Sequence, residues 1–89
     1  MSGTWSLELT PRVLKQLKKL DKPVAHRVLD ELEKLVVSEY PQSHCKALTG
    51  NYSGLWRYRV GSYRVILDID QGKLVLLALG VGHRSTIYR

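Results

Sequence analysis

The stretch that decides the fold is Gly54-Leu-Trp-Arg-Tyr-Arg-Val-Gly-Ser-Tyr-Arg-Val-Ile66. Apolar and polar side chains alternate on both sides of Gly61-Ser62. A glycine-bearing pair between two alternating runs predicts a β-hairpin with a two-residue turn. In this register Val60 pairs with Tyr63, and the apolar and aromatic side chains of both strands share one face.

The other face of this hairpin carries three arginines, Arg57, Arg59 and Arg64. Arg59 and Arg64 are expected to lie directly opposite one another, where like charges destabilise a hairpin by up to about 1 kcal/mol. The planar arginine fork binds phosphate oxygens two at a time, so such a cluster favours a phosphate-binding face. The alternative is three solvated arginines on an exposed strand surface.

Upstream of the hairpin, the chain predicts a short strand over Ser6–Leu9 and then two helices. Thr10-Pro11 starts the first helix, with threonine as N-cap and proline at the first helical position. Its apolar residues recur with helical spacing up to Leu20. Asp21 is expected to cap the second helix, which ends before Tyr40-Pro41. Because the connection is so short, the two should form an αα-hairpin.

Residues 42–54 are polar and predict a loop, and a polar tail is expected over residues 80–89. Three strands are expected between them, at residues 55–60, 63–69 and 74–79. The third is apolar on both faces, which is typical of an interior strand, and Gly72 supplies the turn before it. The order predicts a single domain over residues 1–89, of the α+β class. It has an N-terminal strand, the αα-hairpin and three antiparallel strands, with both helices packed on one sheet face.

The composition indicates a basic, folded protein of 89 residues. Fourteen Lys and Arg against eight Asp and Glu give a net charge of +6, which favours a polyanionic partner over a merely soluble basic domain. No apolar run approaches the roughly 20 residues that span a bilayer, and the start lacks a signal-peptide pattern. We therefore expect a cytoplasmic protein without membrane contact.

Metal and cofactor chemistry is not indicated by the sequence. Cys45 is the only cysteine, so no disulfide and no multi-cysteine site is expected. His26 is expected to face solvent in the second helix. His44 lies beside Cys45 in the predicted loop, and two isolated ligand types make no metal site, so a structural role is expected for it. We expect no cofactor and no bound metal.

The polar tail contributes three further candidates, His83, Arg84 and Tyr88. They follow the last predicted strand, so we expect them at the end of the sheet beside the arginines. Histidine transfers protons near neutral pH, and tyrosine stacks on a base or hydrogen-bonds a ribose or phosphate. An ordinary surface histidine and a tyrosine packed on the core are the alternatives.

Four quoted segments together resemble the RelE/ParE toxin superfamily: the hairpin stretch above, Leu48-Thr-Gly50, Val81-Gly-His-Arg84 and Ile87-Tyr88. The resemblance covers nearly the whole chain. It implies a small α+β toxin that a tightly bound antitoxin neutralises. For the RelE branch it implies a ribosome-dependent endoribonuclease that cleaves messenger RNA in the ribosomal A site. The ribose 2′-hydroxyl attacks the adjacent phosphate, without a metal.

The resemblance also assigns roles by position. Arg57 and Arg59 match a basic pair on the first central strand, and Arg64 matches a phosphate-binding arginine on the next. Arg84 matches the arginine after the last strand, and Tyr88 matches a terminal tyrosine. All five are therefore expected to be catalytic residues.

One departure from the family concerns the proton. Better-studied RelE-type enzymes have lysines where this chain has Arg57 and Arg59. Arginine stays protonated above pH 12 and is a poor general base, although it stabilises charge that develops on a phosphate. We therefore expect Tyr88 or His83 to transfer the proton while the arginines bind and stabilise.

Two other functions remain open at this point. The ParE branch has the same fold and poisons DNA gyrase by protein contact, and a third possibility is a non-catalytic relative that binds RNA or antitoxin. The expected partners are an acidic RelB-like antitoxin, the ribosome and mRNA. Exposed lysines of the helical hairpin are expected to bind ribosomal RNA or the antitoxin, with a solvated helix face as the alternative: Lys15, Lys18, Lys19 and Lys22.

Overall fold

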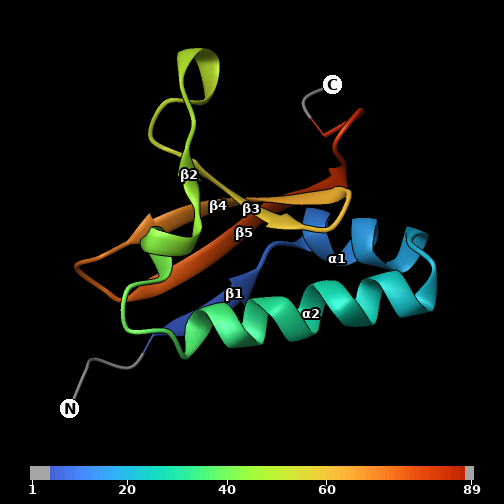
Figure 1. The fold of residues 1–89 in the computed structure, drawn as a ribbon, viewed down its shortest axis with the longest axis horizontal. Coiled ribbons are helices and arrows are strands. Elements are labelled where there is room, and N and C mark those ends of the chain that lie inside the picture. Colours follow the sequence, from blue (N-terminus) through green and yellow to red (C-terminus); the bar gives the residue numbers. More distant parts are fainter. Residues whose placement is uncertain (1–4, 88–89) are drawn as a thin grey trace.

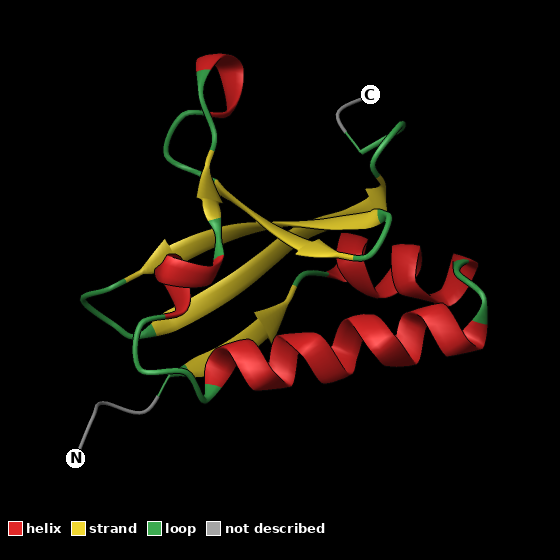
Figure 2. Cartoon of the chain, in the orientation of Figure 1, coloured by secondary structure: helices red, strands yellow, loops and turns green. Residues whose placement is uncertain are grey.

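One mixed sheet and two helices make up residues 5–87, the part of the chain that the structure, a computed structural model, describes. In chain order the elements are β1 (Ser6–Leu9), α1 (Pro11–Lys19), α2 (Lys22–Val36), η1 (Pro41–His44), β2 (Lys46–Ala47), η2 (Gly50–Tyr52), β3 (Trp56–Val60), β4 (Tyr63–Asp70) and β5 (Val75–His83). The strand order is β1-β5-β4-β3-β2. Both helices lie on the same side of the sheet (Figures 1 and 2). The predicted α+β class is confirmed.

The strand β5 is one of the interior strands of the sheet, as its apolar sequence predicts. It pairs in parallel with β1 and antiparallel with β4. The β3–β4 hairpin has the predicted two-residue turn, with Val60 opposite Tyr63. Gly61 adopts φ +58 there, a left-handed conformation that favours glycine.

The start of α1 is joined to β5 through Thr10. As predicted, Thr10 is the N-cap, and its hydroxyl accepts a hydrogen bond from the Val13 amide (3.3 Å). The same hydroxyl donates to the carbonyl of Ala78 in β5 (3.0 Å). Beyond this point β1 has ended, and α1 takes its place beside β5: Gln16 Oε1 accepts from the Val81 amide at 2.8 Å. The N-terminal end of α1 is thus held at the edge of the sheet.

The core lies between the helices and the sheet. Asp21 occupies the predicted N-cap of α2, although its side chain makes no capping hydrogen bond. The side chains that are fully buried in this core come from both helices and from the two central strands: Val13, Val28, Leu32, Val65, Leu67, Leu76 and Ala78. Burial of each valine or leucine side chain in this set stabilises the fold by about 1.5–3 kcal/mol.

The structure corrects three details of the sequence-based expectation. Residues 42–54 are not all loop, because they contain η1, η2 and the two-residue strand β2. The last strand continues through Gly80 to His83, where β4 still provides hydrogen-bonding partners. The turn between β4 and β5 includes Gly72, as predicted, but it continues through Leu74 (φ 56), so β5 begins at Val75 and not at Leu74. Pairing with a neighbouring strand determines where β2 forms and where β5 ends, and local sequence patterns do not contain that information.

Candidate nucleic-acid interface

The sheet face that the helices leave uncovered, here called the open face, carries the three predicted arginines. Arg59 lies opposite Arg64, as expected, and Arg57 lies opposite Ile66. Paired residues of neighbouring strands project from the same face, so all three arginines share the open face. Among residues 5–87, no acidic side chain forms an ion pair with Arg57 or Arg59.

The short strand β2 adds a fourth cation that the sequence analysis did not single out. Lys46 pairs with Arg57 and therefore projects from the open face as well. A two-residue strand gives no recognisable alternation, so the only sequence signal was a lysine close before the hairpin. Lys46, Arg57, Arg59 and Arg64 are called the basic cluster below.

Arg64 differs from the other members because it is buried, with 7% of its surface exposed. Its Nη1 donates to the carbonyl oxygens of Gly61 and Tyr63, both at 3.3 Å. A buried charge is tolerated only where such hydrogen bonds compensate the lost hydration. These contacts fix the guanidinium against its own hairpin turn.

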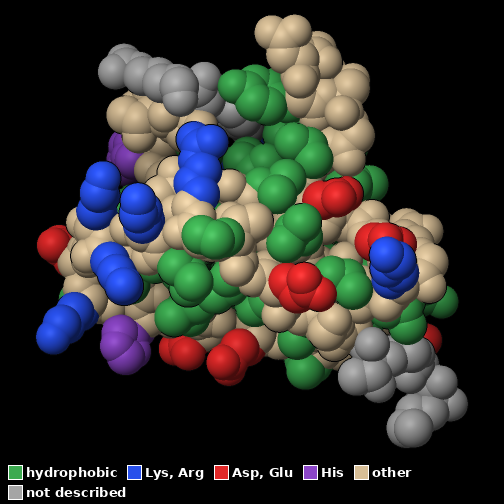
Figure 3. Space-filling view, turned by 180° about the vertical axis from the view of Figure 1, so that it is seen from behind, with side chains coloured by type: hydrophobic (Ala, Val, Ile, Leu, Met, Phe, Trp, Pro, Cys, Tyr) green, Lys and Arg blue, Asp and Glu red, His purple; other side chains and the backbone are tan. Residues whose placement is uncertain are grey.

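Basic side chains also gather on the helical hairpin. Lys15, Lys18 and Lys19 are exposed on α1, as expected, and Arg12 is exposed at its start. Figure 3, the view from behind, shows most of the visible Lys and Arg side chains on its left and many hydrophobic ones in its centre. The opposite end of the sheet is more acidic, with Glu8, Asp68 and Asp70 lining one hollow. The charge of the molecule is therefore unevenly distributed.

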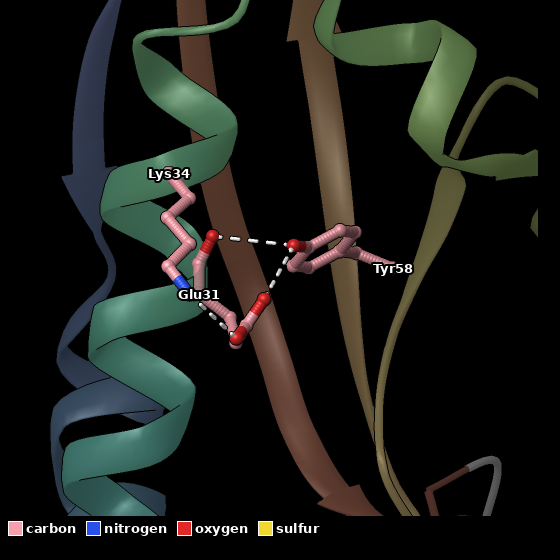
Figure 4. Close-up of polar contacts among 3 residues, drawn as sticks. All are labelled: Glu31, Lys34 and Tyr58. Atoms are coloured by element: carbon pink, nitrogen blue, oxygen red, sulfur yellow. Dashed lines mark hydrogen bonds and ion pairs between the residues drawn. The ribbon is translucent and has the colours of Figure 1, made fainter.

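Between Arg57 and Arg59, the strand β3 is fastened to α2 by Tyr58. The Tyr58 hydroxyl shares its one proton between the main-chain carbonyl of Glu31 (3.2 Å) and the Glu31 carboxylate (3.3 Å). The same carboxylate pairs with Lys34 (3.4 Å) (Figure 4). The pKa of Tyr58 is raised to about 12. The main cause is burial, and the negative charge of Glu31 and the hydrogen bond to it add to the effect. Tyr58 therefore stays neutral and positions the strand from the helix side.

The chain after β5 turns back onto the open face. The Arg84 amide donates to the Ser62 carbonyl (2.9 Å), which places Arg84 next to the β3–β4 turn. Ile87 then lies over Gly80 and Gly82, since a Cβ built on Gly82 would meet the Ile87 Cδ1 at 3.2 Å. Gly82 pairs with Arg64, so the tail returns beside the basic cluster. Tyr88 lies outside the described residues.

His83 is not where the sequence analysis expected it. It belongs to β5 and pairs with Tyr63, and Tyr63 pairs with the buried Val60 on the helix-covered side. The His83 and Tyr63 rings meet edge to face, with centroids 5.6 Å apart. The expectation failed because β5 extends to His83, and strand alternation then directs this side chain away from the arginines.

Other titratable residues supply no site. His26 and His44 are exposed, and residues 5–87 hold no group of three metal-ligating side chains. Burial raises the pKa of Cys45 to about 11, and its thiol donates to the Pro41 carbonyl (3.5 Å). Cys45 is therefore a neutral thiol near pH 7.

The fold and this interface define a class of small basic α+β proteins with an arginine-lined sheet face. Comparison with known proteins makes the class specific. Residues 7–88 match the model of a family described as the ParE toxin of the type II toxin–antitoxin system parDE. The chain belongs to this family, within the RelE/ParE toxin superfamily, and is a toxin of a type II toxin–antitoxin system.

Solved structures with the same fold carry the RelE name. The RelBE2 toxin–antitoxin complex of Mycobacterium tuberculosis matches at 24% identity over 92% of this chain and 93% of that one, with a TM-score of 0.82. The archaeal RelE–RelB complex of Pyrococcus horikoshii matches at 27% identity over 94% and 99%, with a TM-score of 0.75. The intact RelBE complex of E. coli matches at 20% identity over 89% and 95%, with a TM-score of 0.69.

Two further findings concern sequence relatives and membrane-spanning segments. None of the curated proteins compared with this chain matches it in sequence. Within residues 5–87, neither helix has the length and apolar character needed to cross a bilayer.

Proposed function

We propose that this toxin is a ribosome-dependent endoribonuclease that cleaves messenger RNA in the ribosomal A site. One observation carries the proposal: Arg59 faces Arg64 on an open sheet face, with Arg57 and Lys46 in the next row. A fold that places like charges opposite one another loses stability. A phosphate bound in the cluster offsets that loss, because its negative charge attracts both guanidinium groups.

In the proposed reaction, a ribose 2′-hydroxyl loses its proton and attacks the adjacent phosphorus. The bond from phosphorus to the 5′-oxygen breaks, that oxygen takes up a proton, and a 2′,3′-cyclic phosphate remains on the upstream fragment. Negative charge grows on the phosphate oxygens in the transition state. Preorganised cations aimed at that charge supply the stabilisation, so the step needs no metal.

The arginines of the basic cluster and of the tail have different roles in this reaction. Arg64 holds a phosphate oxygen from a fixed position, since carbonyls restrain its guanidinium. Arg57 and Arg59 stabilise the developing charge, and Arg84 approaches from the turn beside Ser62. These four act as the catalytic arginines of the proposal.

Proton transfer is assigned to Tyr88, because the arginines stay protonated. The chain returns onto the open face at Ile87, directly before it. His83 contacts Tyr63 on the other side of the strand, and a direct role in proton transfer is therefore not proposed for it. His83→Ala should keep the wild-type cleavage rate, and Tyr88→Phe should lower it.

The proposed partners follow from the charge distribution and from the complexes that the similar toxins form. Three of those toxins are seen in complexes with antitoxins. For this toxin we propose an acidic RelB-like antitoxin that covers the basic cluster, and cytoplasmic action on ribosomes. Lys15, Lys18 and Lys19 on α1 would contact ribosomal RNA or the antitoxin.

A second candidate is inhibition of DNA gyrase, because the matched family model bears the ParE name. Such a toxin acts through protein contact and has no use for a phosphate-binding face. The two activities are separated by assaying purified toxin on programmed ribosomes and on gyrase supercoiling. The proposal expects mRNA cleavage that Arg64→Ala and Arg84→Ala abolish, with supercoiling unaffected. Inhibited supercoiling without cleavage would establish the second candidate, and neither activity would indicate a non-catalytic binder.

A further inference from the structure

A small hollow opens on the open face next to the basic cluster. Arg12 of α1 lies on one side of it. The other lining residues come from the segment between β2 and β3, from β4 and β5, and from the chain after β5: Tyr52, Leu55, Ile66, Leu79, Gly80 and Ile87. Its volume is about 230 Å³. This is below the roughly 300–1,000 Å³ of pockets that enclose drug-sized ligands, so the hollow suits a group no larger than a single ring system.

The sequence creates this hollow through missing side chains. Gly80 of β5 pairs with Ile66 of β4, and glycine leaves the space beside the isoleucine unfilled. A register shift between Ile66 and Leu67 adds one residue to β5 at Leu79, which also lines the floor. Figure 1 shows η2 and the chain that follows β5, as far as Ile87, on the side of the sheet away from the helices. They border the open face, and Tyr52 and Ile87 bring them to the hollow.

The lining combines three kinds of group. The floor is apolar, from Ile66 and Leu79, while Tyr52 offers an aromatic ring and Arg12 a guanidinium. Unpaired RNA bases are recognised by such sets, because bases stack on aromatic rings and on guanidinium planes and have polar edges that bind donors. Arg12 is exposed, and no acidic side chain among residues 5–87 forms an ion pair with it.

The position of the hollow relates it to the phosphate site. Ile66 on its floor is the register partner of Arg57, and the next pair on the same face of the hairpin is Arg59 with Arg64. Neighbouring residues on one strand face are about 7 Å apart, which is the scale of one nucleotide. A phosphate in the basic cluster would therefore have its neighbouring base within reach of the hollow.

We infer that this hollow binds one unpaired base of an RNA strand whose phosphate lies in the basic cluster, with Arg12 and Tyr52 as the residues that hold it. The inference rests on the proposed function and names a specificity site for it. An apolar side chain of a protein partner would also fit the floor, but it has no use for the guanidinium at the rim. The surrounding charge is positive, which favours the nucleic acid.

The test measures what one base contributes to binding. The probe is a fluorescein-labelled five-nucleotide RNA with 2′-O-methyl riboses, which prevent cleavage. A matched set carries an abasic residue at each position in turn. Fluorescence anisotropy at low salt gives Kd for the wild-type toxin and for Arg12→Met and Tyr52→Leu. The control is Lys73→Met, which removes the same charge at the β4–β5 turn.

For the wild type, an abasic residue at one position should weaken binding about tenfold, as expected for one stacked base. Both variants should bind the intact RNA about tenfold more weakly than the wild type does. For these variants the abasic residue should not raise Kd any further. Lys73→Met should retain the tenfold effect of the missing base. Unchanged thermal unfolding midpoints would show that the variants are folded.

Three results would overturn the inference: no RNA binding by the wild type, no effect of any abasic residue, or the same effect in the variants and the wild type. Loss of antitoxin affinity in the variants, with base dependence unchanged, would instead assign the hollow to the protein partner. Cleavage on ribosomes is measured separately. Base-dependent binding without cleavage would support this site and contradict the proposed activity. Cleavage without base-dependent binding would support the activity and contradict this site.

Discussion

Arg59 and Arg64 face one another on the open sheet, and this pair is where stability and activity conflict most directly. Arg59 is exposed, whereas Arg64 is buried against the turn. The proposed phosphate needs both guanidinium groups, while the free protein carries their repulsion. Removing one charge should therefore change stability and activity in opposite directions.

We predict that Arg59→Gln raises the free energy of unfolding by up to about 1 kcal/mol, since it removes a like-charge pair. The same variant should cut mRNA about 10²-fold more slowly, because a donor to the transition state is lost. Urea unfolding and single-turnover cleavage measure the two effects. A variant that is both less stable and fully active would contradict this account of the pair.

Tyr58 is a residue whose role is structural although it lies between two catalytic candidates. Tyr58→Phe should lower the free energy of unfolding by about 1 kcal/mol, the usual contribution of one hydrogen bond. In the folded state the pKa of Tyr58 is raised from 10.0 to about 12. The stabilisation by its proton is therefore complete below pH 10 and is lost as the pH rises from 10 to 12.

The measurement is urea unfolding of the wild type and of Tyr58→Phe between pH 7 and 11. The difference between the two proteins should shrink above pH 10, and titration of the lysines cancels in that difference. A constant difference over the whole range would show that the hydroxyl has no part in the pH dependence.

At the scale of elements, the sequence was sufficient where local chemistry determines the structure. The Thr10 N-cap, the turn at Gly61 and the pairing of Arg59 with Arg64 depend on nearby residues and were predicted. The strand β2 was missed because two residues show no period. Its position depends on pairing with β3, so Lys46 was not recognised as part of the site.

The end of β5 was missed for a related reason. Gly80 and Gly82 disfavour a strand by propensity, but β4 supplies partners for both of them. The misplaced strand end had a functional consequence, since it reversed the face expected for His83. Side-chain alternation is a reliable guide only when the bounds of the strand are known.

The junction of α1 with β5 gives a prediction at this scale. Gln16→Leu should lower the free energy of unfolding by about 1–3 kcal/mol, because the Val81 amide loses its acceptor. Lys18→Leu, an exposed change on the same helix, should have little effect. Thermal or urea unfolding compares the two. Equal stabilities would mean that the Gln16 contact contributes nothing measurable.

At the scale of the whole molecule, the net charge of +6 is the dominant electrostatic feature. It does not determine the fold, but it selects partners with negative charge. The same basic surface is proposed to meet RNA during action and the acidic antitoxin during neutralisation. Competition between these two partners would then explain neutralisation without any change in the fold.

We predict that the complex with the antitoxin associates more slowly as salt rises, because screening weakens attraction between opposite charges. Association rates measured by surface plasmon resonance should fall at least tenfold between 50 mM and 500 mM salt. The triple variant Lys15→Gln, Lys18→Gln, Lys19→Gln should show a shallower dependence. A rate independent of salt would contradict the electrostatic account of partner binding.

The central claim is that the open face cuts RNA, and the most direct test maps the ends of an mRNA after incubation with toxin and programmed ribosomes. The account predicts a new end inside the A-site codon with a 2′,3′-cyclic phosphate. It also predicts that Arg64→Ala removes this end while Lys73→Met keeps it. Intact mRNA with folded wild-type toxin, or cleavage that Arg64→Ala leaves unchanged, would contradict the claim.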